Sequence, residues 1–467
     1  MKDFLVRICS IELKGFKNTE YGLLEMPSVI NGGCFSKKSD ILGIYGQNGS
    51  GKTAVIEAMA IIQKLLMGNS LPEETVQYIS KEMNRCSILV SFVISVHGKQ
   101  SKVEYSVVLS RIDGNKFEIA QETLSSAVWG DEKFEKKKVL LHFELNDSQV
   151  KFTPNYRYNS IVNHEEENRI NFGVAYKLAQ KEHRSFIFSE ESRRVFLSAP
   201  EEASTEYAYI IRTLNGYAGI NLFVISSAHA GSISMDYLLP FAFRIDTGDT
   251  IVKGSLPVRL DEPSLLGQKH FEMVRQMIDE MNVVLQTLIP GLFIGVHDFG
   301  EQLLENGGTG HRIQLISRRG DVVIPLKYES EGIVKIISIL NALMCVYNDP
   351  SMCLVIDELD SGIYEYLLGE LISVFDKSAK GQLIFTSHNL RALEMLHKSS
   401  VIFSTTNPKK RYMRMQNTKT NKNLRDSYLR CITLGGQKEE VYAETDTVEI
   451  GRAFRRVGKV VRDGRED

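Results

Sequence analysis

Apolar and polar residues alternate along the first part of the chain. Residues 4–16 (FLVRICSIELKGF) alternate between apolar and polar at almost every position, which predicts a strand at the edge of a sheet. Residues 41–45 (ILGIY) form a short apolar run that predicts a buried strand opening into a glycine-rich turn. Apolar residues then recur at helical spacing from residue 52 to 67, which predicts a helix directly after that turn.

A period of two dominates between residues 88 and 145. Runs at 92–96, 103–107 and 117–119 place apolar residues at every second position, and turn pairs such as Asp113-Gly114 separate the runs. This pattern predicts an antiparallel meander.

The middle of the chain, residues 150–290, has a helical character. It begins with a polar stretch that contains Glu165-Glu166-Glu167. Its clearest segment carries apolar residues at steps of three and four from Phe271 to Leu288, and Pro290-Gly291 follows. These steps predict an amphipathic helix that ends at the proline.

An α/β rhythm follows the helical middle. Strand-like runs lie at 292–296, 312–317 and 322–326, and the glycine-rich residues 307–310 between two of them predict a hairpin turn. Helices at 331–347, 363–375 and 390–398 then alternate with buried strands at 353–356 and 382–385. The predicted fold is α/β: residues 1–145 and 291–467 form a mixed-sheet head with an antiparallel lobe, interrupted by a mainly helical insertion at 146–290.

Composition narrows the class of protein. The 467 residues carry 56 basic and 58 acidic side chains, so no overall charge draws the chain to nucleic acid or to a membrane. No apolar run approaches the roughly 18 residues that cross a bilayer. The six cysteines form no C-x-x-C pair, and Cys345 and Cys353 lie in apolar runs where small core residues are expected. We expect a cytoplasmic protein without a membrane partner.

The glycine-rich turn matches a phosphate-binding pattern. Residues 46–53 read Gly46-Gln47-Asn48-Gly49-Ser50-Gly51-Lys52-Thr53, which is G-x-x-x-x-G-K-[ST] between a strand and a helix. Glycines let backbone N–H groups curl around phosphate oxygens, Lys52 adds a positive charge for the β- and γ-phosphates, and the Thr53 hydroxyl is suited to Mg²⁺. The expected phosphate contacts are Gly46, Asn48, Gly49, Ser50, Gly51, Lys52 and Thr53.

An acidic pair completes this chemistry. Leu354-Val355-Ile356-Asp357-Glu358 predicts a buried strand that presents Asp357 to the metal and Glu358 to an attacking water. A cap on the following helix is the simpler explanation of two acidic residues there. The phosphate-binding motif elsewhere in the chain favours a catalytic pair, with Glu358 as the catalytic base.

With these two motifs some 300 residues apart, the chain resembles the ABC and SMC ATPases. Three further motifs match that family in order: Ser330-Glu331-Gly332 in the place of the signature, Asp360-Ser361-Gly362 in the place of the D-loop, and Thr386-Ser387-His388 in the place of the switch histidine. The resemblance implies ATP and Mg²⁺ as cofactors and a head-to-tail dimer. In that dimer Ser330 and Gly332 of one chain would contact the nucleotide of the other, beside Asp360 and His388. The full L-S-G-G-Q signature is missing, and Gln121 is the candidate for the Q-loop glutamine.

A narrower resemblance concerns the OLD-related AAA ATPases of bacterial antiviral defence. It rests on ELDSGIYEYLLGEL after the acidic pair and on NLRDSYLRCITLGG with the later Tyr442. Only about 75 residues follow His388, too few for the Toprim nuclease domain of OLD proteins. The resemblance therefore implies a sensor or scaffold that controls a separately encoded effector, such as a nuclease or a toxin, as in PARIS- and Septu-type systems.

A basic stretch near the end of the sequence makes nucleic acid a candidate partner. Residues 409–430 hold eight basic residues and only Asp426 as an acid, and Tyr412 and Tyr428 lie among them. Such a stretch can neutralise phosphates and stack on bases, although a solvated loop, or one docked on the acidic insertion, is the simpler explanation. An ATP-dependent DNA clamp for repair or recombination is therefore the alternative function, and a nucleotide-binding scaffold that scarcely hydrolyses ATP is the third.

Overall fold

The computed structural model describes residues 4–96, 98–112, 115–146, 149–162, 166–198, 201–226, 238–246, 251–304, 307–415, 424–434, 439–442 and 446–463. The predicted turn at Asp113-Gly114 and the first residue of the Glu165-Glu166-Glu167 run lie outside these residues.

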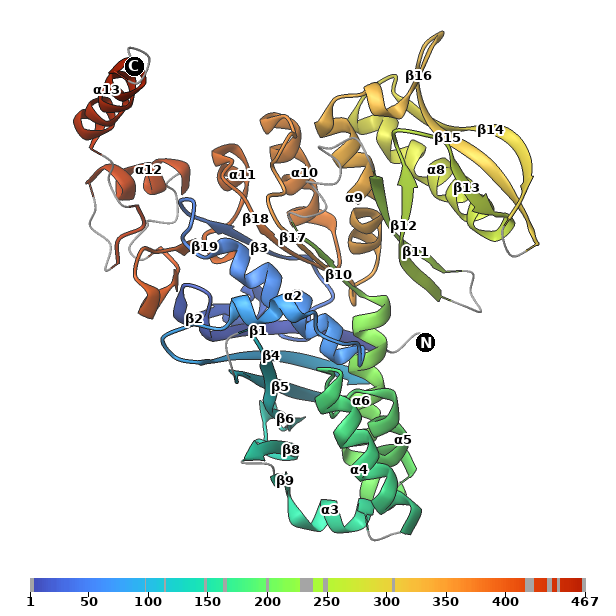
Figure 1. Ribbon diagram of the computed structural model, residues 1–467, viewed down its shortest axis with the longest axis vertical. Coiled ribbons are helices and arrows are strands. Elements are labelled where there is room, and N and C mark those ends of the chain that lie inside the picture. Colours follow the sequence, from blue (N-terminus) through green and yellow to red (C-terminus); the bar gives the residue numbers. More distant parts are fainter. Residues whose placement is uncertain are drawn as a thin grey trace.

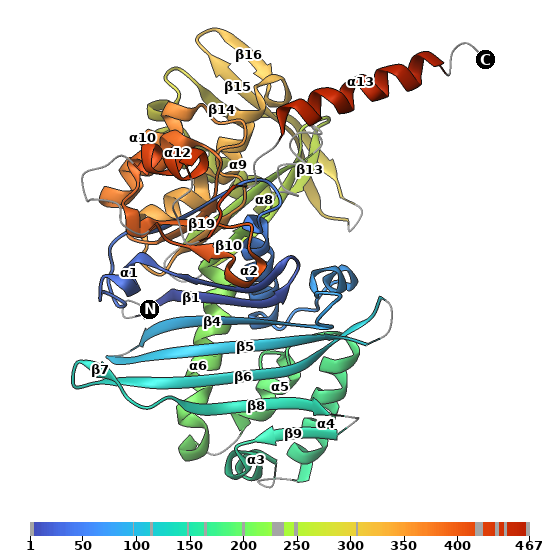
Figure 2. The ribbon, with the colours of Figure 1, turned by 90° about the vertical axis from the view of Figure 1, so that its left-hand side faces the viewer.

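An antiparallel sheet forms one layer of the molecule (Figure 2). Its strands, in pairing order, are β2 (Thr19–Glu25), β1 (Phe4–Phe16), β4 (Arg85–Val96), β5 (Lys99–Arg111), β6 (Phe117–Gly130), β8 (Lys138–Asn146) and β9 (Gln149–Thr153), with β7 (Lys133–Phe134) on β6. The predicted meander is therefore confirmed. The prediction of β1 as an edge strand is wrong, because β1 pairs with β2 on one side and with β4 on the other.

A second, mainly parallel sheet forms the next layer. Its strands, in pairing order, are β10 (Leu222–Ile225), β17 (Cys353–Ile356), β18 (Gln382–Thr386), β3 (Asp40–Tyr45), β19 (Val401–Ser404) and β20 (Tyr412–Met413). Only β20 runs antiparallel to its neighbour. Strand β10 belongs to the predicted insertion, so that segment supplies an edge strand to the head as well as helices.

Helix α2 (Lys52–Leu66) lies between the two sheets (Figure 1). Alternation along β3 explains the layering: Leu42 and Ile44 face α2 and the antiparallel sheet, whereas Ile41 and Tyr45 face the opposite core. Each sheet face therefore has its own core, and one strand joins both.

Further helices pack against the two cores. Those of the first core are α3 (Asn155–Val162), α4 (Glu166–Lys181), α5 (Glu190–Ser198) and α6 (Glu201–Ile220). Those of the second core are α8 (Gln268–Leu288), α9 (Glu331–Asn348), α10 (Glu365–Ser378), α11 (Leu390–Met395) and α12 (Leu424–Leu434). Helix α9 is long and apolar enough to span a bilayer, but 67% of it is buried, as in the core helix of a globular domain.

The following helices and strands remain. They are α1 (Pro27–Ile30), the hairpin of β11 (Leu238–Asp246) and β12 (Ile251–Arg259), the sheet of β13 (Ser264–Gly267), β14 (Phe293–Leu303), β15 (Thr309–Arg319) and β16 (Val322–Pro325), and α13 (Thr447–Asp463). Strands β14 and β15 pair antiparallel on either side of residues 304–308, which confirms the predicted hairpin. The segment predicted as mainly helical thus contains β10 to β13 besides its helices.

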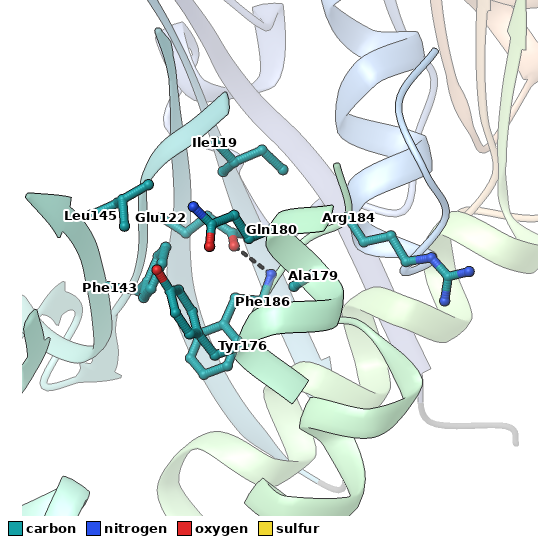
Figure 3. Close-up of a pocket in the computed structure, with 9 residues that line it drawn as sticks. All are labelled: Ile119, Glu122, Phe143, Leu145, Tyr176, Ala179, Gln180, Arg184 and Phe186. Atoms are coloured by element: carbon teal, nitrogen blue, oxygen red, sulfur yellow. Dashed lines mark hydrogen bonds between the residues drawn. The ribbon is translucent and has the colours of Figure 1, made fainter. Parts of the chain in front are cut away.

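A buried carboxyl ties the antiparallel sheet to its helices. Glu122 on β6 is fully buried, and its Oε1 accepts hydrogen bonds from Tyr105 (2.5 Å) and Ser185 (2.6 Å). Its Oε2 accepts one from the Phe186 backbone N–H at 2.6 Å, beside a small cavity (Figure 3). Burial raises the pKa of this carboxyl. Three donors depend on one side chain here.

We expect Glu122→Ala to lower the free energy of unfolding by about 3 kcal/mol or more, because it leaves three buried donors unsatisfied. Tyr105→Phe, which removes only one of the donors, should cost about 1 kcal/mol. Urea unfolding of both variants measures the difference. Equal stability of Glu122→Ala and the wild type would contradict this role.

Candidate functional site

Three parallel strands bring the predicted motifs to one edge of the sheet. Strand β3 ends at Tyr45, β17 ends at Ile356 and β18 ends at Thr386, and β18 lies between the other two. The carboxyl ends of parallel strands share an edge, so the segments that follow each strand meet there. They line a cavity of about 450 Å³ together with the start of α2.

The glycine-rich loop requires glycine for steric reasons. Gly46 has φ of 151°, and a Cβ there would lie 2.0 Å from the Ser404 Oγ on β19. Gly51 has φ of 91° and caps the N-terminus of α2 in the left-handed region. Ser50 turns inward, and its hydroxyl contacts Ser404 and donates to the Gln47 carbonyl at 2.7 Å. The loop therefore directs backbone N–H groups, and not side chains, toward an anion at the helix start.

Lys52 closes this loop on itself. Its Nζ donates to the Gly46 carbonyl at 2.8 Å and to the Gln47 carbonyl at 2.9 Å. Burial lowers the pKa of Lys52, and the carboxylates of Asp357 and Glu358 partly oppose that shift. The ammonium is thus poorly solvated, and a phosphate oxygen would be a stronger acceptor for it than either carbonyl.

Asp357 has one oxygen engaged and one without a partner. Its Oδ1 accepts from the Thr386 hydroxyl at 2.6 Å, and the Thr53 hydroxyl lies 3.4 Å from the same oxygen. Its Oδ2 is buried and has no hydrogen-bond partner among the described residues. A buried carboxylate oxygen in this condition needs a cation or a water. Because Mg²⁺ takes one or two protein oxygens and completes its shell with phosphates and water, Asp357 and Thr53 fit it.

Glu358 has a strained backbone and an exposed side chain. Its φ is 48°, a left-handed value that is unusual for a residue with a Cβ. Its N–H donates to the Thr386 Oγ1 at 2.7 Å, and its carbonyl accepts from the buried Lys335 Nζ on α9. The peptide is therefore held on both sides, which directs the carboxylate into the cavity that it lines.

His388 lies at the same cavity, after β18. Its backbone N–H donates to the Asp360 Oδ2 at 3.0 Å, so the predicted D-loop and switch residues contact each other. Burial and then the charge of Lys52 lower the pKa of the imidazole. At neutral pH His388 is therefore uncharged and keeps one N–H to donate.

The predicted signature residues lie apart from this cavity. Ser330 is exposed at the N-terminus of α9, and its side chain makes no capping hydrogen bond. Gly332 is buried, and a Cβ on it would lie 1.8 Å from the Gly362 carbonyl. Within one chain, Gly332 thus serves close packing between α9 and the Asp360-Ser361-Gly362 turn. Neither Ser330 nor Gly332 lines the cavity of its own chain.

Sequence reasoning missed four residues of this site. Lys17 and Asn18 form the turn between β1 and β2 and line the cavity. Asn18 donates to the Gly49 carbonyl at 2.5 Å. Thr386 forms hydrogen bonds with both acidic residues, and Lys335 donates to the Glu358 carbonyl. Thr386 lies two residues before the predicted switch histidine, so its position at the end of a buried strand was an available signal. Nothing in the sequence pattern singles out Lys335.

The structure does not support Gln121 as the Q-loop glutamine. It lies on β6 and donates to Glu144 on β8 at 2.8 Å. It does not line the cavity. The antiparallel pairing of β6 and β8 accounts for its side chain, and that prediction is wrong.

Most described residues of the basic stretch that carry charge or an aromatic ring contact other residues of the same chain. Arg411 donates to the carbonyls of Thr405 and Asn18. Tyr412 is buried and donates to the Gly51 carbonyl at 2.7 Å, and Tyr428 is buried against Phe403. These tyrosines are therefore not available to stack on bases, contrary to that interpretation.

Further basic residues of the stretch have these contacts: Lys410 pairs with Glu439, Arg414 donates to the Ser399 carbonyl, and Arg425 pairs with Glu394. Lys419 and Lys422 lie outside the described residues.

Thr386→Val tests the support of the acidic pair. Valine keeps the shape but removes the hydroxyl that bonds Asp357 and Glu358, so we expect the predicted ATP turnover to fall about 10–100-fold. Thr386→Ser restores a hydroxyl and should recover most of the rate. Phosphate release at saturating ATP measures both variants. Equal rates for Thr386→Val and wild type would exclude this positioning role.

Comparisons with known proteins found similar solved structures. Among solved structures, an SMC head bound to the C-winged helix domain of ScpA is 13% identical, with a TM-score of 0.43 and coverage of 88% of this chain and 98% of that one. The SMC head domain from Thermotoga maritima is 13% identical, with a TM-score of 0.38 and coverage of 88% and 99%. A head domain derived from Pyrococcus furiosus, with an extended coiled coil and the C-terminal domain of ScpA, is 12% identical, with a TM-score of 0.39 and coverage of 88% and 97%. No curated protein matches the chain.

A protein family also matches. Residues 41–394, more than half of the chain, match the family described as "AAA domain, putative AbiEii toxin, Type IV TA system". The matched segment runs from strand β3, which precedes the glycine-rich loop, past the acidic pair and His388. The chain therefore belongs to this AAA-domain family.

Proposed function

We propose that the chain binds and hydrolyses ATP with Mg²⁺. One observation carries this proposal: Lys52, Asp357 and Glu358 belong to a single cavity at the start of α2, and the buried Oδ2 of Asp357 has no hydrogen-bond partner in the described parts of the chain. A site that only bound nucleotide would need the first two. It would not need a carboxylate held in a left-handed backbone beside them.

Each residue has a role in this reaction. The N–H groups of residues 46–53 and the Lys52 ammonium would hold the phosphates, while Thr53 and Asp357 would hold Mg²⁺, which would supply neutralisation of phosphate charge. Glu358 accepts a proton from the attacking water or orients it. His388, neutral because of its lowered pKa, donates a hydrogen bond toward the γ-phosphate. Asp360 holds the backbone of His388 in place.

The active form is proposed to be a head-to-tail dimer. Ser330 is exposed and lies outside its own cavity, although it begins a helix whose N-terminus is suited to an anion. In a head-to-tail pair, Ser330 of each copy would contact the nucleotide of the other.

Mixing two inactive variants tests the dimer. Lys52→Ala removes the nucleotide site of one chain, and Ser330→Arg blocks the face that it offers to its partner. If sites are shared, each variant alone should be inactive, and an equimolar mixture should regain about a quarter of the wild-type rate, because half of the dimers carry one intact site. An inactive mixture, or full activity of Ser330→Arg alone, would show that the site belongs to one chain.

The cellular role is proposed from the narrower resemblance. As an OLD-related ATPase, the chain would act in the cytoplasm of bacteria as a sensor or scaffold that holds a separately encoded effector, and ATP turnover would control release of that effector. Phage challenge of cells that carry the gene with its neighbours tests this role. Lys52→Ala should lose protection that the wild type gives, and equal plaque counts with and without the wild-type genes would refute the defence role.

A further inference from the structure

The cavity at the start of α2 provides contacts for phosphates but little surface for a base. Among the described residues that line it, the only ring is the His388 imidazole, which the proposed reaction places at the γ-phosphate. Tyr45 and Tyr412 adjoin the glycine-rich loop, but both are buried. Tyr78 stacks on Phe16, with ring centroids 5.6 Å apart. A base that enters this cavity therefore finds no free tyrosine or phenylalanine ring among these residues.

An exposed tyrosine lies two residues before Ser330. Between them, the Glu329 side chain is only 5% exposed, and its carboxylate accepts from the Ser317 hydroxyl at 2.8 Å and from Arg319 at 3.0 Å, both on β15. The residues on either side of it face solvent: Ser330 is exposed, and Tyr328 is 67% exposed. Glu329 therefore anchors this segment to the sheet, and the segment presents an aromatic ring together with the Ser330 hydroxyl.

The spacing of this ring and this hydroxyl suits a nucleotide. The backbone of Glu329 is extended, with φ of −75° and ψ of 162°. The Cα atoms of Tyr328 and Ser330 are therefore about 6–7 Å apart, and the tyrosine ring reaches farther from the backbone than the serine hydroxyl. In ATP the base and the γ-phosphate lie at opposite ends of the molecule, with the ribose between them. A serine on the phosphates and a ring on the base match that order.

We infer that Tyr328 of one copy stacks on the base of the nucleotide that the other copy holds. The inference rests on the proposed function, in which Ser330 of the same segment contacts the neighbouring nucleotide. Base–aromatic stacking tolerates any base, because every base has a π-face. Tyr328 would therefore favour a nucleoside triphosphate over a bare triphosphate. The base would gain this contact only when the two copies pair.

Binding of ATP and of tripolyphosphate, which has the phosphates but no base, tests the inference. In a Glu358→Gln chain, Tyr328→Ala should weaken binding of Mg²⁺ and ATP at least about tenfold and leave that of Mg²⁺ and tripolyphosphate unchanged. Tyr328→Phe keeps the ring and should bind ATP like its parent. Tyr156→Ala removes an equally exposed tyrosine, on α3, and is the matched control.

The two ligands separate stacking from a structural effect. An equal loss of affinity for both would show that Tyr328 only supports the start of α9, and would overturn the inference. Unchanged ATP binding by Tyr328→Ala would overturn it as well, while the proposed function stands. If the Glu358→Gln parent binds neither ligand, the proposed function itself fails, and this inference fails with it.

An ATP analogue with a fluorescent aminopurine base shows which copy supplies the ring, because stacking quenches its emission. The Glu358→Gln chain should quench it. A chain that also carries Tyr328→Ala holds nucleotide without the ring, and a chain that instead adds Lys52→Ala keeps the ring without nucleotide. Neither double variant should quench alone, whereas their equimolar mixture should. A mixture that stays bright, although the Glu358→Gln chain quenches, would place the stacking ring in the same chain and overturn the inference.

Discussion

Lys52→Ala should abolish ATP binding while the fold stays intact. The Lys52 ammonium donates to two loop carbonyls, and phosphate oxygens would replace these carbonyls as its acceptors. Loss of two charge-assisted hydrogen bonds weakens binding by at least about a hundredfold. Isothermal titration with Mg²⁺ and a non-hydrolysable ATP analogue measures the loss directly.

Thermal unfolding supplies the second readout of this variant. ATP should raise the melting temperature of the wild type, because a ligand that binds only the folded state stabilises it, and should leave that of Lys52→Ala unchanged. Lys17→Ala is the matched control, since Lys17 also lines the cavity but forms an ion pair with Glu57 at 2.6 Å. It should retain binding within about tenfold. An affinity of Lys52→Ala equal to that of Lys17→Ala would contradict the assignment of the loop.

Local patterns predicted the elements that carry the site. The run at 41–45, the glycines at 46–51 and the helical spacing after Lys52 lie within 30 residues, and all three became β3, the loop and α2. The acidic pair was found in the same way, because the apolar run that forms β17 is followed directly by two acidic residues. Strand–turn–helix units of this kind depend on neighbouring residues, which a sequence shows directly.

Long-range pairing accounts for the errors. The alternation in β1 showed that one face is buried but not that strands pair on both sides. Strand β10 has only four residues, Leu222–Ile225, and it pairs with β17 more than 120 residues later. So short a run has no readable period within a helical segment, and its sheet is set by contacts distant in sequence.

Side-chain partners were also hidden from the sequence. The charge run at 409–430 left a nucleic-acid surface, a solvated loop and a docked loop open. In the structure Arg411 donates to the carbonyl of Asn18, and Tyr412 donates to that of Gly51. Lys335 is similar, because a lysine in an apolar helix predicts an exposed position and not a bond to the Glu358 carbonyl. In each case the partner is a backbone carbonyl on another element, and no composition rule specifies it.

Glu358→Gln should separate binding from chemistry. The amide has the size of the carboxyl but cannot take a proton from water, so we expect hydrolysis to fall about 10²–10⁴-fold. The side chain is exposed, and its backbone is held by Thr386 and Lys335, so the folded state should be nearly unchanged. ATP affinity should equal or exceed that of the wild type. Glu365→Gln, an exposed acid at the start of α10 that does not line the cavity, is the control and should hydrolyse normally.

The same variant should accumulate the ATP-bound dimer. If Ser330 of the second copy contacts the nucleotide, a pair of chains that holds ATP without cleaving it stays closed. Sedimentation in Mg²⁺ and ATP should therefore show a dimer that dissociates on addition of EDTA. Adding Ser330→Arg to Glu358→Gln should prevent that dimer but keep ATP bound in each chain. Hydrolysis by Glu358→Gln at the wild-type rate would exclude Glu358 as the catalytic base. An ATP-dependent dimer that survives Ser330→Arg would instead leave the base in place and show that the copies meet through another surface.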